Sequence, residues 1–240
     1  MTAVLVNYAD RGYYEAQKLN RTTGLLIGGL DRAVCYSRAD IDESFAERHR
    51  GTLAKTIGAG NWLWKPYALV KALREELKDN DILFYSDSGA QFTGSAAPAI
   101  SLCLAQTEKP VLLFTLDPRY MNRQLIKRDC FVYMNMDTPP YPDMNAVLAS
   151  FIVCRKTQFT LSFFEEWLAF AEDARILGDE PNVCGLPNYP DFFEHRYDQA
   201  ILSLLARKHG IATVPDISQW GNSYRPGDIP QILAHTRWKA

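Results

Sequence analysis

The stretch that decides the fold is DILFYSDSG, residues 81–89. Its apolar run ILFY predicts a buried strand, which ends in an acidic turn where Asp87 precedes Gly89. A glycine at this place lets the backbone approach a ligand closely. The segment before the strand, NWLWKPYALVKALREELKDN, predicts a helix over 65–78, because proline is tolerated in a first turn and an apolar stripe follows it. A helix that leads into a buried strand of this kind indicates an α/β fold.

Strands and helices alternate along the whole chain. Short apolar runs predict the strands, and apolar residues at helical spacing predict the helices. Strands are expected at 3–8, 33–37, 81–87, 111–116, 130–136, 147–156 and 211–215, and helices at 13–26, 65–78, 161–177 and 196–208. This order predicts one Rossmann-like α/β domain over residues 1–240, with a mainly parallel mixed sheet covered by helices on both faces. Ligands of such folds bind at the carboxyl ends of the strands.

Composition excludes several classes of protein. The net charge is −2, from 26 basic and 28 acidic side chains that are well interspersed, so no electrostatic footprint for nucleic acid is present. The five cysteines form no C-x-x-C pair, which argues against zinc ribbons and thioredoxin-like chemistry and favours free thiols in a reducing cytosol. The N-terminal apolar run is too short for a signal peptide, and the uncharged stretch 88–107 is too rich in glycine, proline and polar residues to span a membrane. We therefore expect a cytoplasmic protein.

Asp87 and the residues before the helix are the first candidates for a site. A carboxylate at a strand end can hold Mg²⁺ or Mn²⁺, which take oxygen ligands from one or two carboxylates and from substrate phosphates. An Asp-Ser-Gly turn without a ligand is the alternative interpretation. Lys65 can place a point charge beside a phosphate, and Trp62 and Trp64 can stack on a base or a sugar ring. Packing tryptophans and a solvated helix start are the alternatives for these three residues.

A second group of candidates precedes the last helix, in HRYDQAILSLL at 195–205. Four polar side chains of different chemistry gather there, namely His195, Arg196, Asp198 and Gln199. A helix cap is one interpretation, since a carboxylate in the first turn satisfies free amides and favours the helix dipole. The other is that Asp198 accepts a hydrogen bond or a proton from a sugar hydroxyl, and that Gln199 orients this hydroxyl.

His235 and Arg237 are the last candidates, near the C-terminus in ILAHTRWKA. A neutral imidazole is a competent ligand for Mn²⁺, and a guanidinium suits a bidentate phosphate contact. A histidine so close to the chain end can equally be a surface residue.

Taken together, these motifs resemble a known family. G-x-G-N-W-L-W-K-P-Y, D-I-L-F-Y-S-D-S-G, H-R-Y-D-Q-A-I-L-S-L-L and H-T-R, in this order over residues 3–238, are similar to bacterial glycosyltransferases of the GT-A fold, particularly small ones associated with surface polysaccharide synthesis. The resemblance implies a nucleotide-binding half at about 1–115 and an acceptor half at about 116–240. It also implies a nucleotide-diphosphate sugar as donor, a saccharide or glycolipid as acceptor, Mn²⁺ or Mg²⁺ as cofactor, and at most a peripheral membrane association.

The resemblance also implies roles for individual residues. In this family a D-x-D motif at a strand end binds the metal and the diphosphate; Asp87 matches its first position, but Ser88 and Gly89 replace the rest. The implied donor-binding residues are Tyr8, Ala9, Asp10, Trp64, Lys65, Asp87, Ser88 and Arg237. The implied metal ligands are Asp87 and His235, the catalytic residues Asp198 and Gln199, and the acceptor-binding residues His195 and Arg196.

Two other functions stay open at this point. A sugar-1-phosphate nucleotidyltransferase would show a glycine-rich, basic phosphate loop after the first strand, where this chain has NYADRGYYEAQ, with one glycine and one arginine. A non-catalytic protein that binds a saccharide or a nucleotide is the second alternative, because the acidic motif is incomplete.

Overall fold

The apolar runs of the sequence form a six-stranded central sheet in the computed structural model, which describes residues 1–10, 12–218 and 229–236. The strand order is β2-β1-β3-β6-β5-β7. The strands are β1 (Ala3–Tyr8), β2 (Arg32–Tyr36), β3 (Ile82–Ser86), β5 (Val111–Thr115), β6 (Val147–Arg155) and β7 (Ala212–Pro215). β6 runs antiparallel to its neighbours β3 and β5, and the other pairs are parallel. The predicted α/β fold with a mainly parallel mixed sheet is therefore confirmed.

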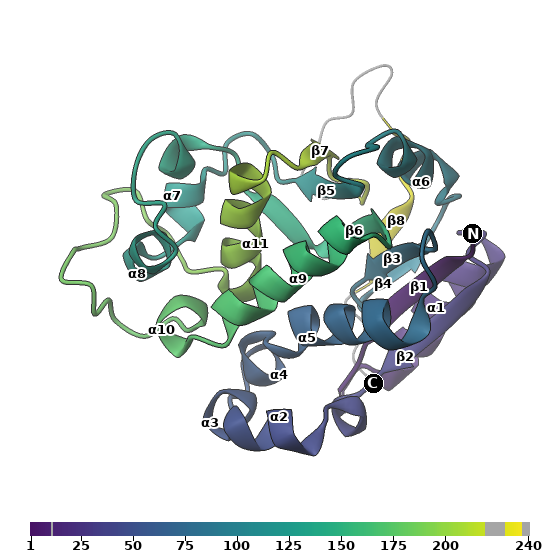
Figure 1. Cartoon of the computed structure of the whole chain (residues 1–240), viewed down its shortest axis with the longest axis horizontal. Helices are drawn as coiled ribbons and strands as arrows, with labels where there is room; N and C mark the ends of the chain where they lie inside the picture. Colours follow the sequence, from purple (N-terminus) through teal and green to yellow (C-terminus); the bar gives the residue numbers. More distant parts are fainter. Residues whose placement is uncertain (11, 219–228, 237–240) are drawn as a thin grey trace.

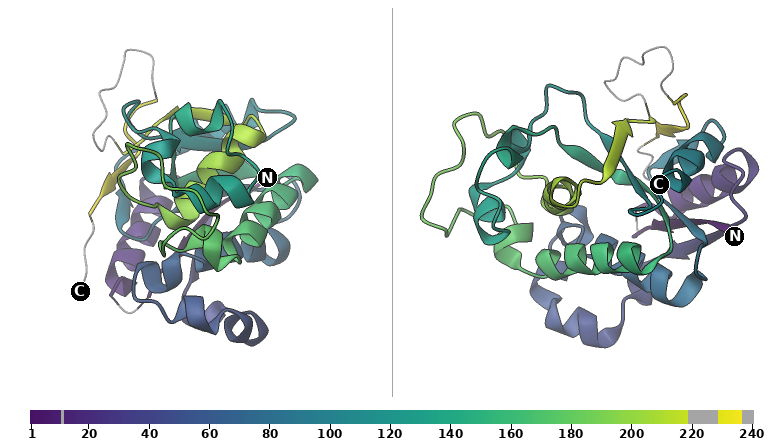
Figure 2. Two further views of the ribbon diagram at one scale, coloured as in Figure 1. Left: turned by 90° about the vertical axis from the view of Figure 1, so that its left-hand side faces the viewer. Right: turned by 45° about the horizontal axis from the view of Figure 1, so that its top comes forward.

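Helices cover both faces of this sheet (Figures 1 and 2). Alternate residues of a strand point to opposite faces, so Val4 and Val6 of β1 join one apolar core and Leu5 joins the other. The first core lies under α5 (Trp64–Lys71), α9 (Gln158–Ala171) and α11 (Tyr197–Lys208). The second lies under α1 (Tyr14–Leu26), α6 (Ala97–Leu104) and a small sheet of β4 (Ala90–Phe92) with β8 (Leu233–His235).

Short helical segments connect these elements. They are α2 (Glu43–Arg48), α3 (Arg50–Leu53), α4 (Gly58–Asn61), α7 (Asn122–Leu125), α8 (Arg128–Tyr133) and α10 (Ala174–Leu177), with the 3₁₀ turns Arg38–Asp40 and Tyr141–Asp143. The predicted helix at 65–78 is α5 followed by a π-helical turn at Ala72–Glu76, and the predicted helix at 161–177 is divided between α9 and α10. No helix in the described part of the chain is long and apolar enough to cross a membrane.

The strand predicted at 130–136 is wrong, because this segment begins inside helix α8. Its buried residues follow helical spacing rather than alternation: Cys130, Phe131 and Met134 all face the core. A tertiary contact fixes the helix, since the carboxylate of Asp129 accepts backbone N–H groups from the loop that leads to α11. An apolar run of this length does not distinguish a buried strand from a buried helix.

The register of the sheet brings the carboxyl ends of β1 and β3 together. Val6 pairs with Tyr85, so the residues after Tyr8 and after Ser86 leave the sheet side by side. The pairing of β6 with β5 shifts register between Ile152 and Leu148, and such an irregularity releases strand carbonyls from the ladder. The carboxyl ends of two strands and the distorted part of a third thus meet at one place.

A buried network of amide side chains fixes this meeting point. Asn20 of α1 is fully buried, and its side chain accepts a hydrogen bond from Asn7 at 2.8 Å. It donates to the hydroxyl of Ser86 at 2.9 Å and to the carbonyl of Ala90 at 2.8 Å. One side chain therefore connects β1, the end of β3 and the start of β4 across the turn that carries Asp87.

We predict that Asn20→Ala lowers the free energy of unfolding by about 3 kcal/mol, because it leaves several buried polar groups without partners. Urea denaturation followed by circular dichroism measures the change. Thr22→Ala, at an exposed position of the same helix, is the control and is expected to change stability by less than about 0.5 kcal/mol. Equal effects of both substitutions would contradict the role of the network.

Candidate active site

A cavity of about 910 Å³ lies where the ends of β1 and β3 face the start of α5 and the start of α11. It is within the size range of ligand sites, roughly 300–1,000 Å³. Its lining includes every predicted site residue that the structure describes, namely Tyr8, Ala9, Asp10, Trp64, Lys65, Asp87, Ser88, His195, Arg196, Asp198, Gln199 and His235. Arg237 lies outside the described residues. Segments far apart in the sequence thus come together at the predicted edge of the sheet.

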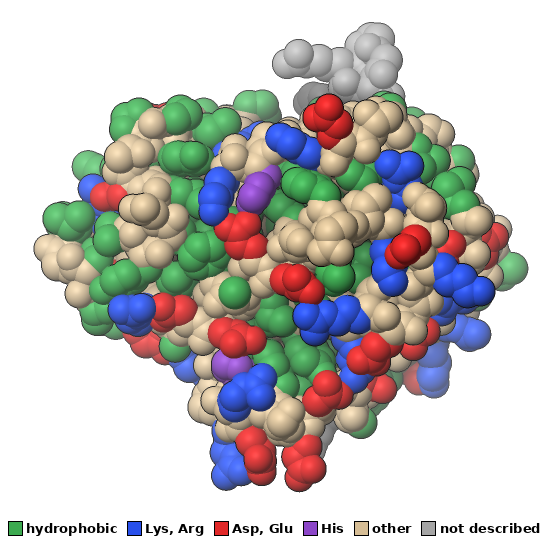
Figure 3. Space-filling view, viewed as in Figure 1, with side chains coloured by type: hydrophobic (Ala, Val, Ile, Leu, Met, Phe, Trp, Pro, Cys, Tyr) green, Lys and Arg blue, Asp and Glu red, His purple; other side chains and the backbone are tan. Residues whose placement is uncertain are grey.

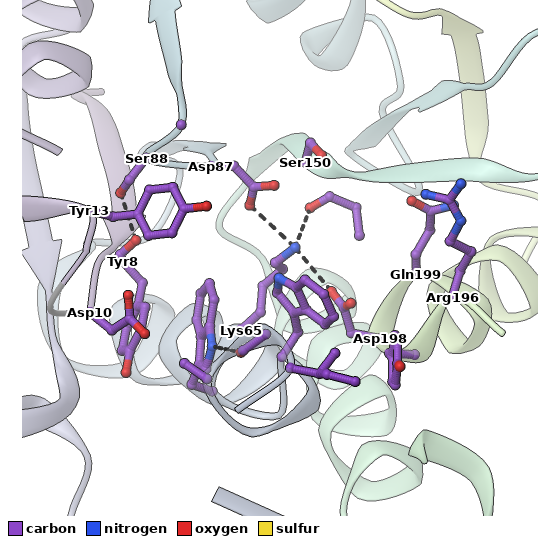
Figure 4. Close-up of a pocket in the computed structure, with 18 of the residues that line it drawn as sticks. Tyr8, Asp10, Tyr13, Lys65, Asp87, Ser88, Ser150, Arg196, Asp198 and Gln199 are labelled. Atoms are coloured by element: carbon purple, nitrogen blue, oxygen red, sulfur yellow. Dashed lines mark hydrogen bonds and ion pairs between the residues drawn. The ribbon is translucent and has the colours of Figure 1, made fainter. Parts of the chain in front are cut away.

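Lys65 stands at the centre of this arrangement (Figure 4). Its side chain is 3% exposed, and its Nζ lies 3.3 Å from Oδ1 of Asp87 and 3.1 Å from Oδ2 of Asp198. It also donates a hydrogen bond to the carbonyl of Ala149 at 3.2 Å, in the distorted part of β6. The ammonium therefore joins the start of α5 to the end of β3, to β6 and to the first turn of α11.

Asp87 presents its two oxygens to different surroundings. Oδ1 accepts a hydrogen bond from the hydroxyl of Tyr85 at 2.6 Å and faces Lys65. Burial holds the pKa of Tyr85 well above its usual value, so this hydroxyl keeps its proton and donates. Oδ2 makes no hydrogen bond or ion pair with any residue that the structure describes, and the side chain is 30% exposed. Asp87 therefore keeps one oxygen for a ligand in the cavity.

The cluster holds one cation and two carboxylates. Burial alone lowers the pKa of Lys65, but Asp198 and Asp87 together raise it above its usual value, so the ammonium keeps its charge. Burial raises the pKa of Asp198 to about 6, although Lys65 opposes this shift. The raised pKa of Lys65 and the raised pKa of Asp198 are consistent with each other. Lys65 has two carboxylates that stabilise its charged form, whereas Asp198 shares a single cation with Asp87. Asp198 therefore gains its proton at a higher pH than an ordinary aspartate does.

A second wall of the cavity is aromatic. The rings of Tyr8 and Trp64 stack with centroids 3.9 Å apart and planes inclined by 13°. The indole N–H of Trp64 donates to the carbonyl of Gly58 at 2.8 Å. Gly58 has φ of +56°, and a Cβ at this position would lie 2.2 Å from the ring of Trp62, so only glycine fits. The G-x-G of the sequence is therefore a structural requirement of this wall.

The ends of β1 and β3 are connected at the same wall. The hydroxyl of Ser88 donates to the carbonyl of Tyr8 at 2.6 Å, within the buried part of the site. Asp10 and Tyr13 lie beside Tyr8 on this side of the cavity, across from Asp198 and Gln199 (Figure 4). The donor-binding residues predicted from the first strand and the catalytic residues predicted from the last helix thus border one space from opposite sides.

The residues at the start of α11 differ in what they offer a ligand. His195 is buried, and both ring nitrogens are engaged: Nδ1 accepts the N–H of Lys127 at 3.2 Å and Nε2 lies 3.0 Å from the carbonyl of Ile176. Burial lowers the pKa of His195 to about 4, so the ring is neutral at pH 7. Arg196 is exposed and pairs with Glu194. Gln199 has a buried side-chain nitrogen that finds no partner among the described residues, and such groups are rare unless a ligand or water satisfies them.

The side chains of this site can hold a metal ion only if a substrate supplies some of its ligands. His235 lies on β8 opposite Ala90, and it lines the same cavity as Asp87. The described residues contain no group of three or more histidine, cysteine or acidic side chains that could hold a metal ion. An ion at Asp87 Oδ2 would therefore take further ligands from phosphates and water, which is how Mg²⁺ is usually bound. The role of His235 as a ligand stays a prediction.

Several residues of the site escaped the sequence analysis. Tyr85 was assigned to the strand as an apolar residue, and Ser150 and Ala149 lie within a strand that gave no polar signal. The turn at 58–62 has positive φ at each residue, from Gly58 to Trp62. Its Gly-x-Gly-Asn sequence is typical of such a backbone, and this signal could have indicated a shaped loop.

A mixed sheet with the ligand cavity at its strand ends and helices on both faces is the GT-A-like fold implied by the resemblance. Mouse xyloside xylosyltransferase 1, in its apo form, has a similar structure, with a TM-score of 0.51 over 96% of each chain. The two sequences are 8% identical, so the likeness extends to the fold alone. No protein-family model matches the chain, and no curated protein matches it in sequence.

We predict a pH dependence of stability that comes from Asp198. Because its pKa is raised in the folded protein, the folded state binds more protons than the unfolded state between the usual carboxylate pKa and about 6. This contribution grows as the pH falls, by about 1 kcal/mol from pH 7 to pH 5, whereas the raised pKa of Lys65 gives no change in that window.

Urea denaturation at several pH values measures the effect. Relative to Asp198→Asn, the wild type should gain stability on acidification from pH 7 to pH 5. Parallel pH profiles of the two proteins would show that Asp198 does not titrate in this range.

Proposed function

We propose that the protein is a glycosyltransferase that moves a sugar from a nucleotide-diphosphate sugar to a hydroxyl of a saccharide acceptor. One observation carries the proposal: a single buried lysine pairs with both Asp87 and Asp198, and all three residues line one strand-end cavity. The GT-A-like fold supports it, since the comparable mouse protein is a xylosyltransferase by name. The resemblance in the sequence motifs further suggests a bacterial, cytoplasmic enzyme of surface polysaccharide or lipopolysaccharide synthesis.

In this proposal the donor lies along the wall made by β1 and β3. Tyr8, Ala9 and Asp10 contact the nucleotide, and Ser88 keeps the two strand ends together. The diphosphate lies near Asp87, with Arg237 as its bidentate contact. Asp87 and His235 would hold Mn²⁺ or Mg²⁺, which would neutralise charge on the departing diphosphate. Lys65 forms ion pairs with both Asp87 and Asp198, and these contacts orient the two carboxylates.

The transfer breaks the bond between the anomeric carbon and the diphosphate oxygen, which leaves with the electron pair. The acceptor oxygen forms the new bond to that carbon and loses its proton. Asp198 is the group proposed to accept this proton or to orient the hydroxyl, and its pKa of about 6 suits a general base that acts near neutral pH. Gln199, with its unpaired buried nitrogen, is proposed to orient the same sugar.

A thermal-shift screen tests the donor class. The purified protein is heated with UDP-, GDP-, CMP- and dTDP-sugars, each with Mn²⁺ and with EDTA. One nucleotide class should raise the midpoint with Mn²⁺, since a ligand at a hundredfold excess over its dissociation constant stabilises the native state by about 2.7 kcal/mol.

Asp87→Ala is expected to remove the metal-dependent part of this shift. Asp117→Ala, which removes an acidic side chain after β5 and outside the cavity, is the matched control and should retain it. No shift with any nucleotide sugar would contradict the proposal, and an unchanged shift in Asp87→Ala would place the diphosphate elsewhere.

Asp198→Asn is predicted to lower the turnover number by about 10²–10⁴-fold with the donor identified in the screen, while the donor affinity changes little. Release of the nucleotide in the presence of acceptor measures the rate. Asp173→Asn, at the cap of α10, is the control for the loss of a negative charge. Full turnover of Asp198→Asn would exclude Asp198 as base and as orienting group.

A further inference from the structure

A second cavity, of about 420 Å³, adjoins the candidate active site. The two cavities share Glu194, His195 and Tyr197 in their linings, so the segment that leads into α11 separates them. The second cavity is lined mostly by the loop between α10 and α11, together with Lys127. A ligand that extends past Tyr197 can therefore occupy both spaces.

Two aromatic side chains with unusual backbones mark the boundary. Trp62 has φ of +58° and Tyr197 has φ of +45°, in the left-handed region that bulky residues rarely adopt. Their rings lie 5.2 Å apart and are inclined by 43°. The hydroxyl of Tyr197 donates to Asp179 at 2.8 Å, which fixes the ring at this place. Backbone strain of this kind persists where the surroundings impose it, and it gathers at ligand sites.

The lining of the second cavity offers the groups that recognise sugars. It contains the ring of Phe192 and two polar groups that keep hydrogen-bonding capacity, because the amide nitrogen of Asn188 and Oδ1 of Asp179 have no partner among the described residues. The amide of Asn182 is engaged with Asp129, Leu186 and Asn188, so it shapes the wall of the cavity. Amides and carboxylates exchange hydrogen bonds with hydroxyl groups, and aromatic rings pack on the apolar faces of sugar rings.

The charges of this lining favour a neutral ligand over an anionic one. Lys127 is the one cationic side chain among the described residues that line it. Its Nζ already lies 3.5 Å from Asp129 and donates to the carbonyl of Glu180 at 3.0 Å. Of the three carboxylates in the lining, Glu180 pairs with Lys55 and Glu194 pairs with Arg196, whereas Asp179 has no cationic partner among the described residues. A phosphate or a uronate would therefore find no unpaired cation here and would face the carboxylate of Asp179, whereas a neutral ligand needs no such cation.

We propose that the second cavity is the acceptor subsite and that it takes an uncharged saccharide. The sugar ring packs at the boundary formed by Trp62 and Tyr197, and the reacting hydroxyl enters the first cavity, which Asp198 lines. This inference rests on the proposed function, and it names the class of acceptor that the function leaves open. It also gives His195 an indirect part, since its engaged ring positions the segment between the cavities.

Phe192→Ala and Phe193→Ala form a matched pair for the test. Phe192 lines the second cavity, whereas its neighbour Phe193 is 77% exposed and lines neither cavity. Saturation-transfer NMR with lactose, maltose, cellobiose and digalacturonate, at millimolar concentrations, measures saccharide binding without a donor. At least one neutral disaccharide should bind the wild type and Phe193→Ala equally, bind Phe192→Ala about five- to tenfold more weakly, and bind better than digalacturonate.

The thermal shift with the nucleotide sugar, measured on the same samples, separates the two proposals. A donor shift that is present in all three proteins, with disaccharide binding that ignores Phe192, would overturn the acceptor subsite and leave the proposed function standing. Preferred binding of digalacturonate, or no binding of any neutral disaccharide, would also overturn it. Absence of a donor shift in the wild type would instead contradict the proposed function, whatever the disaccharides do.

Discussion

The ion pairs of Lys65 with Asp87 and Asp198 are the interaction on which the site depends. An ammonium that is 3% exposed is tolerated only when its charge and its hydrogen bonds are compensated, because removal of one partner leaves a buried ion. The partners that compensate the charge of Lys65 come from the end of β3, from β6 and from the start of α11. These elements and α5 must therefore meet around the Nζ atom of Lys65. The cavity is the space that remains when these elements converge, so the packing of the core and the geometry of the site follow from the same contact.

The antiparallel strand β6 makes this contact possible. In a uniform sheet the carbonyl of Ala149 would be held by a neighbouring strand, but the register shift against β5 leaves it to Lys65. The backbone of the next residue accepts the N–H of Asp87 at 2.9 Å, so the acidic turn is anchored to the same strand. On the face shown in Figure 3, basic and acidic side chains intermingle, as the net charge of −2 suggests.

Local patterns in the sequence predicted the sheet and the edge at which the site lies, because the run ILFY and the helix of HRYDQAILSLL have clear periodicities. The helix α8 was mistaken for a strand because its apolar residues fit either period over a short run. The pairing of Lys65 could not be predicted, since its partners are distant in the chain and either a surface lysine or a phosphate contact fits the same residue. Tyr85 was hidden for a similar reason: a tyrosine inside an apolar strand gives no sign that its hydroxyl binds a carboxylate.

The charge balance of the cluster limits how a diphosphate can bind. Lys65 is already shared by two carboxylates, and at pH 7 the three side chains together carry an excess of negative charge. A diphosphate that enters the same cavity adds further negative charge, so positive charge must accompany it. Asp87 Oδ2 can supply one oxygen to a divalent cation, and Arg196 is a basic residue that lines the cavity. If the donor is a nucleotide-diphosphate sugar, Lys65 does not bind its phosphates as the sequence predicts, because both carboxylates already engage this ammonium. Another cation must then bind the diphosphate.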